Sequence, residues 1–217
     1  MSRKTKETAV VAPGDRRAAK HAATVAAILE TARGVMRAEG AGALTLAEVA
    51  RRMGMRPPSL YEYFPNKHAL YDALFRLGFE LYSERLALIR AQTTPLDAVR
   101  VSLEQYLAFA TENPELYQLC FERPVPGFVP SAESLAVSQE LLAGAVAQVE
   151  SYVASGQVQP LLGLTAMQTF DLINAMTHGL TALHRANEPH LPPGQGRFGS
   201  LVPAVVELFR RAGMLPG

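Results

Sequence analysis

Residues 44–74, with the sequence LTLAEVARRMGMRPPSLYEYFPNKHALYDAL, contain the start and stop signals of several short helices. Thr45 and Glu48, three residues apart, form the pattern of a capping box, which predicts that a helix begins at Leu46. Gly54 should end that helix, because glycine adopts the left-handed backbone of a helix end at little cost. A chain with these signals must turn sharply after a short helix.

A second short helix is predicted at 57–63. Pro57 fits its first turn, where a backbone N–H would have no helical partner in any case. Asn66 is expected to cap a third helix, which begins at Lys67. Two short helices around a tight turn form a helix-turn-helix, whose second helix enters the major groove of DNA. The segment 57–63 is therefore the predicted recognition helix.

These residues resemble the DNA-binding domain of tetracycline-repressor (TetR) family regulators, and the resemblance covers roughly residues 24–74. The matching residues are Thr45, Glu48, Ala50, Gly54, Leu60, Tyr61, Tyr63, Phe64, Asn66, Lys67 and Leu70. The resemblance is specific because many residue types agree at fixed offsets. It implies an all-α fold of about nine helices, with an N-terminal three-helix helix-turn-helix domain. It also implies a C-terminal helical domain that binds a small molecule and forms a homodimer.

The rest of the chain agrees with that architecture, since no strand-like alternation persists anywhere along it. We expect a basic disordered arm at 1–20, the helix-turn-helix domain at 21–67 and an effector-binding and dimerisation domain at 68–217. The first helix should run over 21–39, and a long helix at 67–90 should join the two domains. Further helices are expected at 94–111, 113–123, 134–155, 161–187 and 201–212.

The charges of the chain are distributed unevenly. Residues 1–67 carry 12 Lys and Arg against 6 Asp and Glu, whereas the remainder carries 9 against 14. A basic N-terminal third attached to an acidic body indicates a module that binds a polyanion. The alternative is a solvated basic tail, because residues 3–20 supply half of the positive charges in that third.

The composition argues against several other classes of protein. The apolar fraction is 48%, but no apolar run approaches the about 18 residues of a membrane helix. The N-terminus lacks the apolar stretch of a secretory signal. Cys120 is the single cysteine, which fits a reducing cytoplasm. The histidines show no metal-ligand spacing, so we expect no metal. We also expect no cofactor, and no membrane partner because no apolar run is long enough.

The resemblance places four residues on the exposed face or leading edge of the recognition helix, namely Arg56, Pro57, Ser59 and Tyr61. Arg56 is the best candidate for reading a base, since its guanidinium can bond both O6 and N7 of guanine. Ser59 can bond a base or a phosphate, and Pro57 offers only an apolar contact. The family positions that hold phosphates are occupied here by Thr45, Tyr63 and Lys67. Lys67 is helped by the helix N-terminus at which it stands.

Some of these residues have a purely structural alternative. Thr45 can serve as a plain helix cap, and it can fill both roles at once. Tyr61 and Tyr63 can pack into the core instead of contacting DNA. Glu62 departs from what a DNA-facing helix favours, because it would either repel phosphate or accept from a cytosine amino group. Its role stays open.

The C-terminal part supplies candidates for an effector site, which usually has apolar walls and few polar anchors. They are Tyr106, Phe109, Tyr117, Phe121, Met167, Phe170, Asn174 and His178. The alternative is an ordinary core, with His178 as a hydrogen-bonded core histidine. The resemblance implies a dimer through the helices at 161–187 and 201–212, where small residues such as Gly179 and Ala182 let helices approach closely.

The favoured hypothesis is a cytoplasmic homodimeric repressor of transcription that binds double-stranded operator DNA. A small, largely apolar effector would release it. A ligand-responsive activator is the first alternative. An interaction protein that has lost operator binding is the second, although Arg56, Tyr63 and Lys67 argue against it. An enzyme with Cys120 as nucleophile and His178 as base would lack a glycine-rich nucleophile turn, a metal spacing and a phosphate loop.

Overall fold

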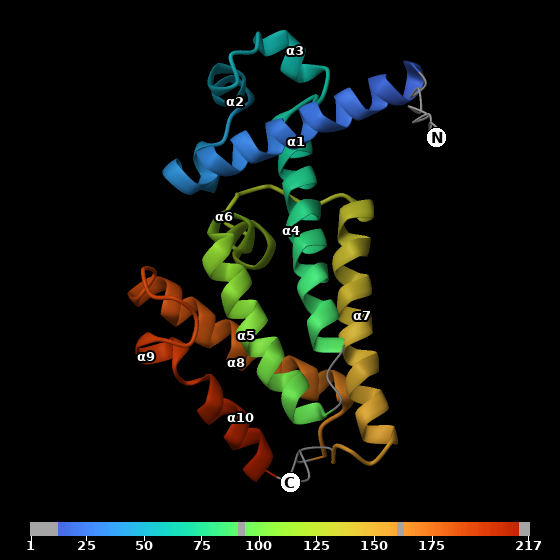
Figure 1. The fold of residues 1–217 in the computed structure, drawn as a ribbon, viewed down its shortest axis with the longest axis vertical. Helices are drawn as coiled ribbons and strands as arrows, with labels where there is room; N and C mark the ends of the chain where they lie inside the picture. Colours follow the sequence, from blue (N-terminus) through green and yellow to red (C-terminus); the bar gives the residue numbers. More distant parts are fainter. Residues whose placement is uncertain (1–12, 91–93, 160–162, 213–217) are drawn as a thin grey trace, which may run out of the picture. The chain divides into compact units, whose positions relative to one another are not determined.

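The computed structural model describes residues 13–90, 94–159 and 163–212, and these form an all-α fold (Figure 1). Within those ranges there is no strand, so the predicted fold class is confirmed. The chain divides into two compact units, Met1–Leu70 and Tyr71–Gly217. The division falls inside a continuous helix, α4 (Lys67–Arg90), three residues after the boundary we expected. A bilayer could not be crossed by any of the described helices, judged by their length and hydropathy.

The first unit consists of helices packed around one small core. Its elements are α1 (Pro13–Glu39), a 3-10 turn η1 (Ala41–Ala43), α2 (Leu46–Arg52), α3 (Pro57–Tyr61) and the start of α4. α1 packs against α2, and α2 packs against α3. The side chains of Ile28, Ala32, Val49 and Leu60 are fully buried. This core holds the two short helices in place.

α1 begins earlier than we expected. Its first residue is Pro13, whereas the prediction began the helix at His21 and assigned the preceding residues to a disordered arm. Residues 1–12 of that arm lie outside the described part of the chain. Residues 16–23 are exposed, so the helix does not depend on core packing there. Proline suits the first turn of a helix, and alanines such as Ala18 have the highest helix propensity, which accounts for the extension.

α2 begins at Leu46 as predicted, because the Thr45 hydroxyl accepts a bond of 3.1 Å from the Glu48 amide. The reciprocal half of the capping box is replaced by ion pairs. Both carboxylate oxygens of Glu48 accept from Arg51 and Arg52 at 2.7–2.8 Å. The hydrogen bonds from Arg51, and then those from Arg52, lower the pKa of Glu48 to about 2. The helix start was therefore correctly predicted, but the partner of Glu48 was not.

The turn after α2 has the geometry that the sequence predicts. Gly54 has a φ of +64°, in the left-handed region. α3 ends at Tyr61 and not at residue 63, because the amides of Tyr63 and Phe64 both donate to the Leu60 carbonyl at 3.0 Å. α4 then begins at Lys67, as predicted.

The second unit is a larger bundle. It contains the rest of α4, α5 (Pro95–Glu112), α6 (Pro114–Tyr117), a π-helical turn η2 (Gln118–Glu122), α7 (Ala132–Ala154), α8 (Ala166–Asn187), α9 (Gly196–Gly199) and α10 (Val202–Arg211). α8 packs against α5, α7 and α9, and α10 packs against α5. A buried cluster joins Val99 and Leu103 of α5 to Val205 and Phe209 of α10.

The ends of these helices follow local signals. α8 begins at Ala166, five residues after the predicted start, because Thr165 and Gln168 form a complete capping box there. Asp72 of α4 accepts bonds from the Ser131 amide at 2.7 Å and from the Ser134 hydroxyl at 2.8 Å. These bonds attach the N-terminus of α7 to α4 within the second unit.

The π-helical turn η2 lies very close to α4. A Cβ at position 78 would lie 2.5 Å from Sγ of Cys120, so Gly78 permits this approach and a larger residue would displace the thiol. The Cys120 thiol is buried and donates to the Phe75 carbonyl at 3.6 Å. Burial also raises the pKa of Cys120, so the thiolate needed for nucleophilic chemistry is disfavoured.

Candidate nucleic-acid interface and ligand cavity

α3, the predicted recognition helix, presents one face to solvent. Arg56, Pro57 and Tyr61 are exposed, and Tyr61 keeps 53% of its surface accessible. Ser59 is half-buried, whereas Leu60 is fully buried. Leu60 therefore anchors the helix to the core, and the exposure of Tyr61 leaves it available for contact.

The arginines around the turn differ in their partners. Arg51 and Arg52 are held by Glu48, and Arg52 also pairs with Glu39. Arg56 is the N-cap residue of α3, and its side chain makes neither an ion pair nor a hydrogen bond within the described part of the chain. Of the three arginines, Arg56 is thus the one whose guanidinium N–H donors are all available to another molecule.

The three predicted phosphate contacts lie in the same unit. The Thr45 hydroxyl uses its oxygen as an acceptor in the helix cap, so its hydrogen is still available to a phosphate. Tyr63 is half-buried, and its ring centroid lies 5.0 Å from that of His21. Lys67 is half-buried at the first residue of α4. Glu62 is exposed just after α3, and nothing in the structure assigns it a role.

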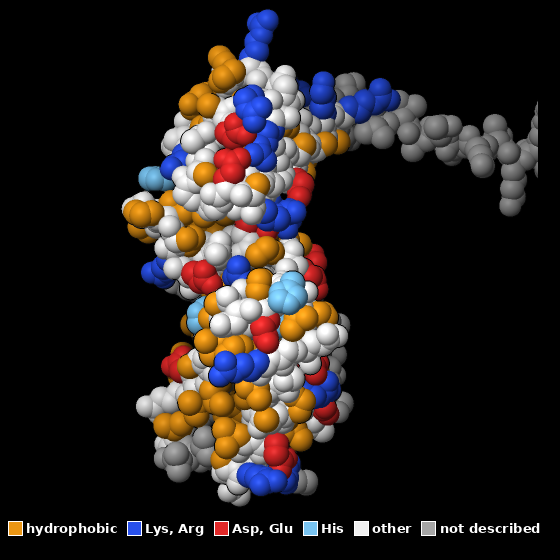
Figure 2. All heavy atoms as spheres, turned by 90° about the vertical axis from the view of Figure 1, so that its left-hand side faces the viewer, with side chains coloured by type: hydrophobic (Ala, Val, Ile, Leu, Met, Phe, Trp, Pro, Cys, Tyr) orange, Lys and Arg blue, Asp and Glu red, His pale blue; other side chains and the backbone are white. Residues whose placement is uncertain are grey.

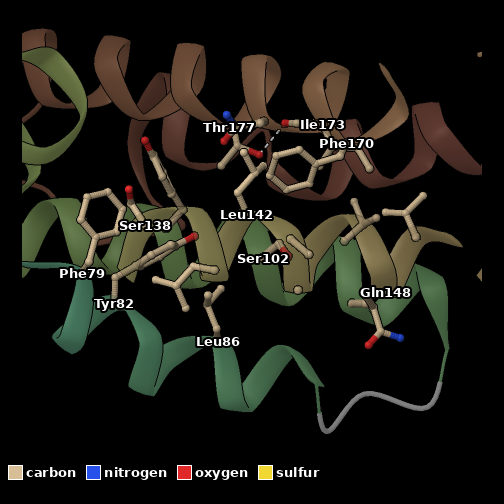
Figure 3. A pocket seen from close by; sticks show the side chains of 18 of the residues that line it. Phe79, Tyr82, Leu86, Ser102, Ser138, Leu142, Gln148, Phe170, Ile173 and Thr177 are labelled. Carbon is tan, nitrogen blue, oxygen red and sulfur yellow. Dashed lines mark hydrogen bonds between the residues drawn. The ribbon is translucent and has the colours of Figure 1, made fainter. Parts of the chain in front are cut away.

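A cavity of about 540 Å³ lies within the second unit, between α4, α5, α7 and α8 (Figure 3). Its volume falls within the range of about 300–1,000 Å³ that is typical of small-molecule sites. The walls are mostly apolar, with Leu86, Leu142 and Ile173 contributed by three of the helices. Among the described residues that line it, Arg123 alone is charged. The cavity is thus suited to a largely apolar ligand.

The predicted effector residues divide evenly between the cavity and other places. Those that line it are Tyr106, Phe121, Phe170 and Asn174. Phe109 and Tyr117 are fully buried elsewhere in the unit, and the ring of Phe109 packs 5.3 Å from that of Tyr82. Met167 is 44% exposed and does not line the cavity. His178 lies behind Tyr106 and also does not line it.

Half of the lining residues come from α4 and α7, on which no effector residue was predicted. They include Phe79, Tyr82, Leu86, Ser138, Leu142 and Gln148, all labelled in Figure 3. A signal for α7 was present in the sequence, because this helix is apolar around much of its circumference. In the structure Ser134 is nevertheless its one fully buried residue. An apolar helix with so little packing is what the wall of a cavity requires.

A polar cluster stands behind the cavity. The hydroxyls of Tyr106 and Tyr117 lie 3.0 Å and 3.1 Å from the same nitrogen, Nδ1 of His178. The Tyr117 ring stacks on the ring of His178. The guanidinium carbon of Arg185 lies 4.5 Å from the centroid of the same Tyr117 ring. Burial raises the pKa of Tyr117 to about 12, so its hydroxyl stays protonated. His178 is thus half-buried and hydrogen-bonded within the unit, which agrees with the alternative that we considered to a ligand contact.

The second unit also carries an exposed apolar face on α8 and α10. Leu172 and Leu183 of α8 are 37% and 46% exposed, and Leu208 of α10 is 56% exposed. Hydrophobic side chains gather on the part of this unit that Figure 2 shows. Gly179 is on α8 between the two leucines, and a Cβ there would meet nothing within 4 Å. Such a face is typical of a surface that another molecule covers.

Comparison with known families matches both parts of the chain. Residues 28–74 match the bacterial regulatory proteins of the tetR family, and residues 99–202 match the tetracyclin repressor-like C-terminal domain. The nucleoid occlusion factor SlmA of Vibrio vulnificus (strain YJ016) is 31% identical over 83 residues, which are 38% of this chain and 42% of SlmA. The chain thus spans about two fifths of the length of the curated relatives that it matches.

Solved structures share the fold over most of the chain. A protein of unknown function from Rhodococcus sp. RHA1 superimposes with a TM-score of 0.73 at 21% identity, over 88% of this chain and 95% of that one. AibR, solved in complex with isovaleryl coenzyme A and operator DNA, gives a TM-score of 0.65 at 17% identity, over 85% of this chain and 96% of AibR. At identities this low, the structural similarity establishes a common fold and nothing more.

Proposed function

This chain belongs to the TetR family of bacterial regulatory proteins, and on that premise we propose that it regulates transcription as a DNA-binding homodimer in the cytoplasm. Its main form of action is repression. A small, largely apolar effector enters the cavity of the second unit and releases the protein from double-stranded operator DNA.

The observation that carries this proposal is the continuity of α4. Its first residue, Lys67, belongs to the unit that contains the helix-turn-helix, whereas Phe79, Tyr82 and Leu86 of the same helix line the cavity. A ligand in the cavity therefore contacts the element that leads to the DNA-binding residues. It shifts the equilibrium only if it prefers the released arrangement of α4 over the bound one.

On the DNA side, Arg56 reads a base, with Ser59, Pro57 and Tyr61 beside it on the exposed face of α3. Thr45, Tyr63 and Lys67 hold phosphates and so set the register of the helix on the duplex. A two-fold dimer places two copies of α3 in successive major grooves, about 34–36 Å apart or a multiple of that distance.

On the effector side, Tyr106, Phe121, Phe170 and Asn174 contact the ligand together with residues of α4 and α7. The volume and the apolar walls of the cavity support this assignment. Further support comes from AibR, whose solved complex contains both an acyl coenzyme A and operator DNA on a similar fold.

A binding protein is favoured over an enzyme by the state of the two residues that a nucleophilic mechanism would use. Cys120 is buried with a raised pKa, and its thiol is directed at a backbone carbonyl. Nδ1 of His178 already faces the hydroxyls of Tyr106 and Tyr117. Cys120 is therefore not placed to attack a substrate, and His178 is not placed to remove the proton of the Cys120 thiol.

The test begins with DNA selection, because the operator is unidentified. Fragments of genomic DNA are selected on the full-length protein at about 0.15 M salt, where non-specific binding is weakened, and the best fragment is footprinted. We expect one palindromic site whose half-sites are about one or two helical turns apart. A promoter fusion then distinguishes a repressor from an activator. Equal affinity for every fragment would contradict operator recognition.

A further inference from the structure

The cavity is not uniform along its length. Figure 3 shows Phe79, Tyr82 and Ser138 toward one end and Gln148 and Phe170 toward the other. The ring of Phe121 lies 5.4 Å from that of Phe79 and 5.9 Å from that of Tyr82. Arg123 follows Phe121 by two residues and also lines the cavity, so it belongs to the first end. This end will be called the Arg123 end.

The Arg123 end opens to solvent and carries positive charge. Arg123 is exposed although it lines the cavity, so it stands where the cavity meets water. It forms no ion pair among the described residues, and none of the described residues that line the cavity is an Asp or Glu that could neutralise it. The preceding residue, Glu122, is directed to Arg185 at 3.5 Å. The guanidinium therefore lacks a counter-charge beside an apolar cavity.

A second donor stands at the same end. The hydroxyl of Tyr82 has no hydrogen-bond partner in the ranges that the structure describes. Burial raises the pKa of Tyr82, so this hydroxyl remains an O–H donor at physiological pH. Arg123 and Tyr82 together offer donors and no charged acceptor. A positive charge with hydrogen-bond donors suits an anionic group. It would repel a protonated amine.

The backbone conformation of Arg123 is unusual for a residue with a side chain. Its φ is +49°, and it is the one non-glycine residue of the described chain with a positive φ. Glycine would occupy this left-handed conformation without the steric cost that a Cβ brings. The position nevertheless holds a long cationic side chain. A residue kept where its backbone is strained points to a use for its side chain.

We propose that the cavity binds a ligand made of one alkyl or acyl chain that ends in an anionic group. The anion lies at the Arg123 end, within reach of Arg123 and Tyr82, and the chain extends toward Leu86 and Phe170. This inference rests on the proposed function, because it names the class of the effector. A free carboxylate and a phosphate ester share this chemistry and are distinguished below.

The test uses the full-length protein without DNA and four probes of equal chain length: decanoate, decyl phosphate, 1-decanol and decylamine. Affinities are measured by calorimetry below the micelle concentration of each probe. We expect at least one anion to bind about fivefold more tightly than decanol, the upper range for an ion pair at an exposed position. Decylamine should bind most weakly. The preference should shrink at 1 M salt, where the screening length is about 3 Å. The tighter of the two anions identifies the headgroup.

Two variants assign the preference to its residues. Arg123→Gly suits the left-handed backbone, so the fold should be retained while decanoate and decanol bind equally. Tyr82→Phe should reduce the preference and keep the apolar contacts. Arg100→Gln is the matched control, since Arg100 pairs with Asp97 and Glu104 and does not line the cavity. It should keep the full preference.

Three results would overturn the proposal. They are equal affinity of decanoate, decyl phosphate and decanol for the unaltered protein, an unchanged preference in Arg123→Gly, and the absence of binding by all four probes. Each would leave operator recognition untouched, because DNA selection and footprinting are carried out without any effector. The ligand class and the proposed regulator can therefore fail separately.

Discussion

Replacing Gly179 by glutamate should convert the proposed dimer into folded monomers. A Cβ at Gly179 meets no atom within 4 Å inside the protomer, so the new side chain has space in a single chain. Its neighbours on α8, Leu172 and Leu183, are 37% and 46% exposed. A carboxylate on this face costs little in water. It becomes costly only when a second copy covers it.

The size of the effect follows from symmetry. A two-fold interface contains the substitution twice, once from each copy. Leaving one charge buried without a partner costs about 3–5 kcal/mol. Even the lower value for a single charge weakens association by a factor of about 100, since each 1.4 kcal/mol is about tenfold. A dimer with a dissociation constant of about 1 nM would then have one of about 0.1 μM and be largely dissociated at about 10 nM, and two buried charges would dissociate it at micromolar concentrations.

Sedimentation equilibrium measures the association, and circular dichroism measures the helix content of the same samples. Gly179→Glu should sediment as a monomer with unchanged helix content, and it should fail to bind a full operator. Gly179→Ala adds no charge and should remain a dimer. Ala147→Glu places the same charge on an exposed position of α7, outside the proposed interface, and should also remain a dimer. A dimeric Gly179→Glu beside a monomeric Ala147→Glu would show that the interface is on the wrong helices.

Three further predictions concern DNA and its coupling to the effector. Arg56→Ala should lose about 1–3 kcal/mol on the operator but little on random DNA, because one bidentate base contact disappears; equal losses in a gel shift would make Arg56 a phosphate contact. Lys67→Ala should weaken binding to all sequences alike and reduce the slope of log K against log salt by about one unit per subunit; an unchanged slope would mean that Lys67 does not touch the backbone. By linkage, operator DNA should weaken the binding of an effector by the same factor by which the effector weakens operator binding, and identical calorimetric affinities with and without operator would exclude the induction mechanism.

The sequence alone determined the helix-turn-helix. Thr45 starts α2, Gly54 makes the turn, and Lys67 begins α4, each where the pattern predicts. These signals act between residues at most four apart, so they do not depend on the rest of the fold. Competition between such signals was harder to judge. Glu48 prefers the two arginines one turn further along α2 to the amide of Thr45.

The inner faces of the helices in the second unit could be predicted from the sequence. What each inner side chain contacts could not. Helical periodicity distinguishes the inner face of a helix from the outer face. It does not tell whether an inner residue meets another side chain or an empty space. Phe109 and Phe121 are both aromatic residues of the same unit, yet Phe109 is packed completely and Phe121 lines the cavity. His178 was also predicted as an effector residue. It does not line the cavity, but its Nδ1 contacts the hydroxyl of Tyr106, which does.

The cavity and its charge were decided by the tertiary structure alone. The wall draws on four helices, α4, α5, α7 and α8, and it forms only where they meet. The apolar pattern of α7 indicates that the helix is covered, but it does not indicate that Leu142 and Gln148 face a cavity. The position of Arg123 depends on a π-helical turn that packs against Gly78, and on a left-handed residue that no local signal predicts. Caps and turns are stabilised by interactions between residues close in sequence. A cavity is the space left after all the helices have packed, so no single segment specifies it.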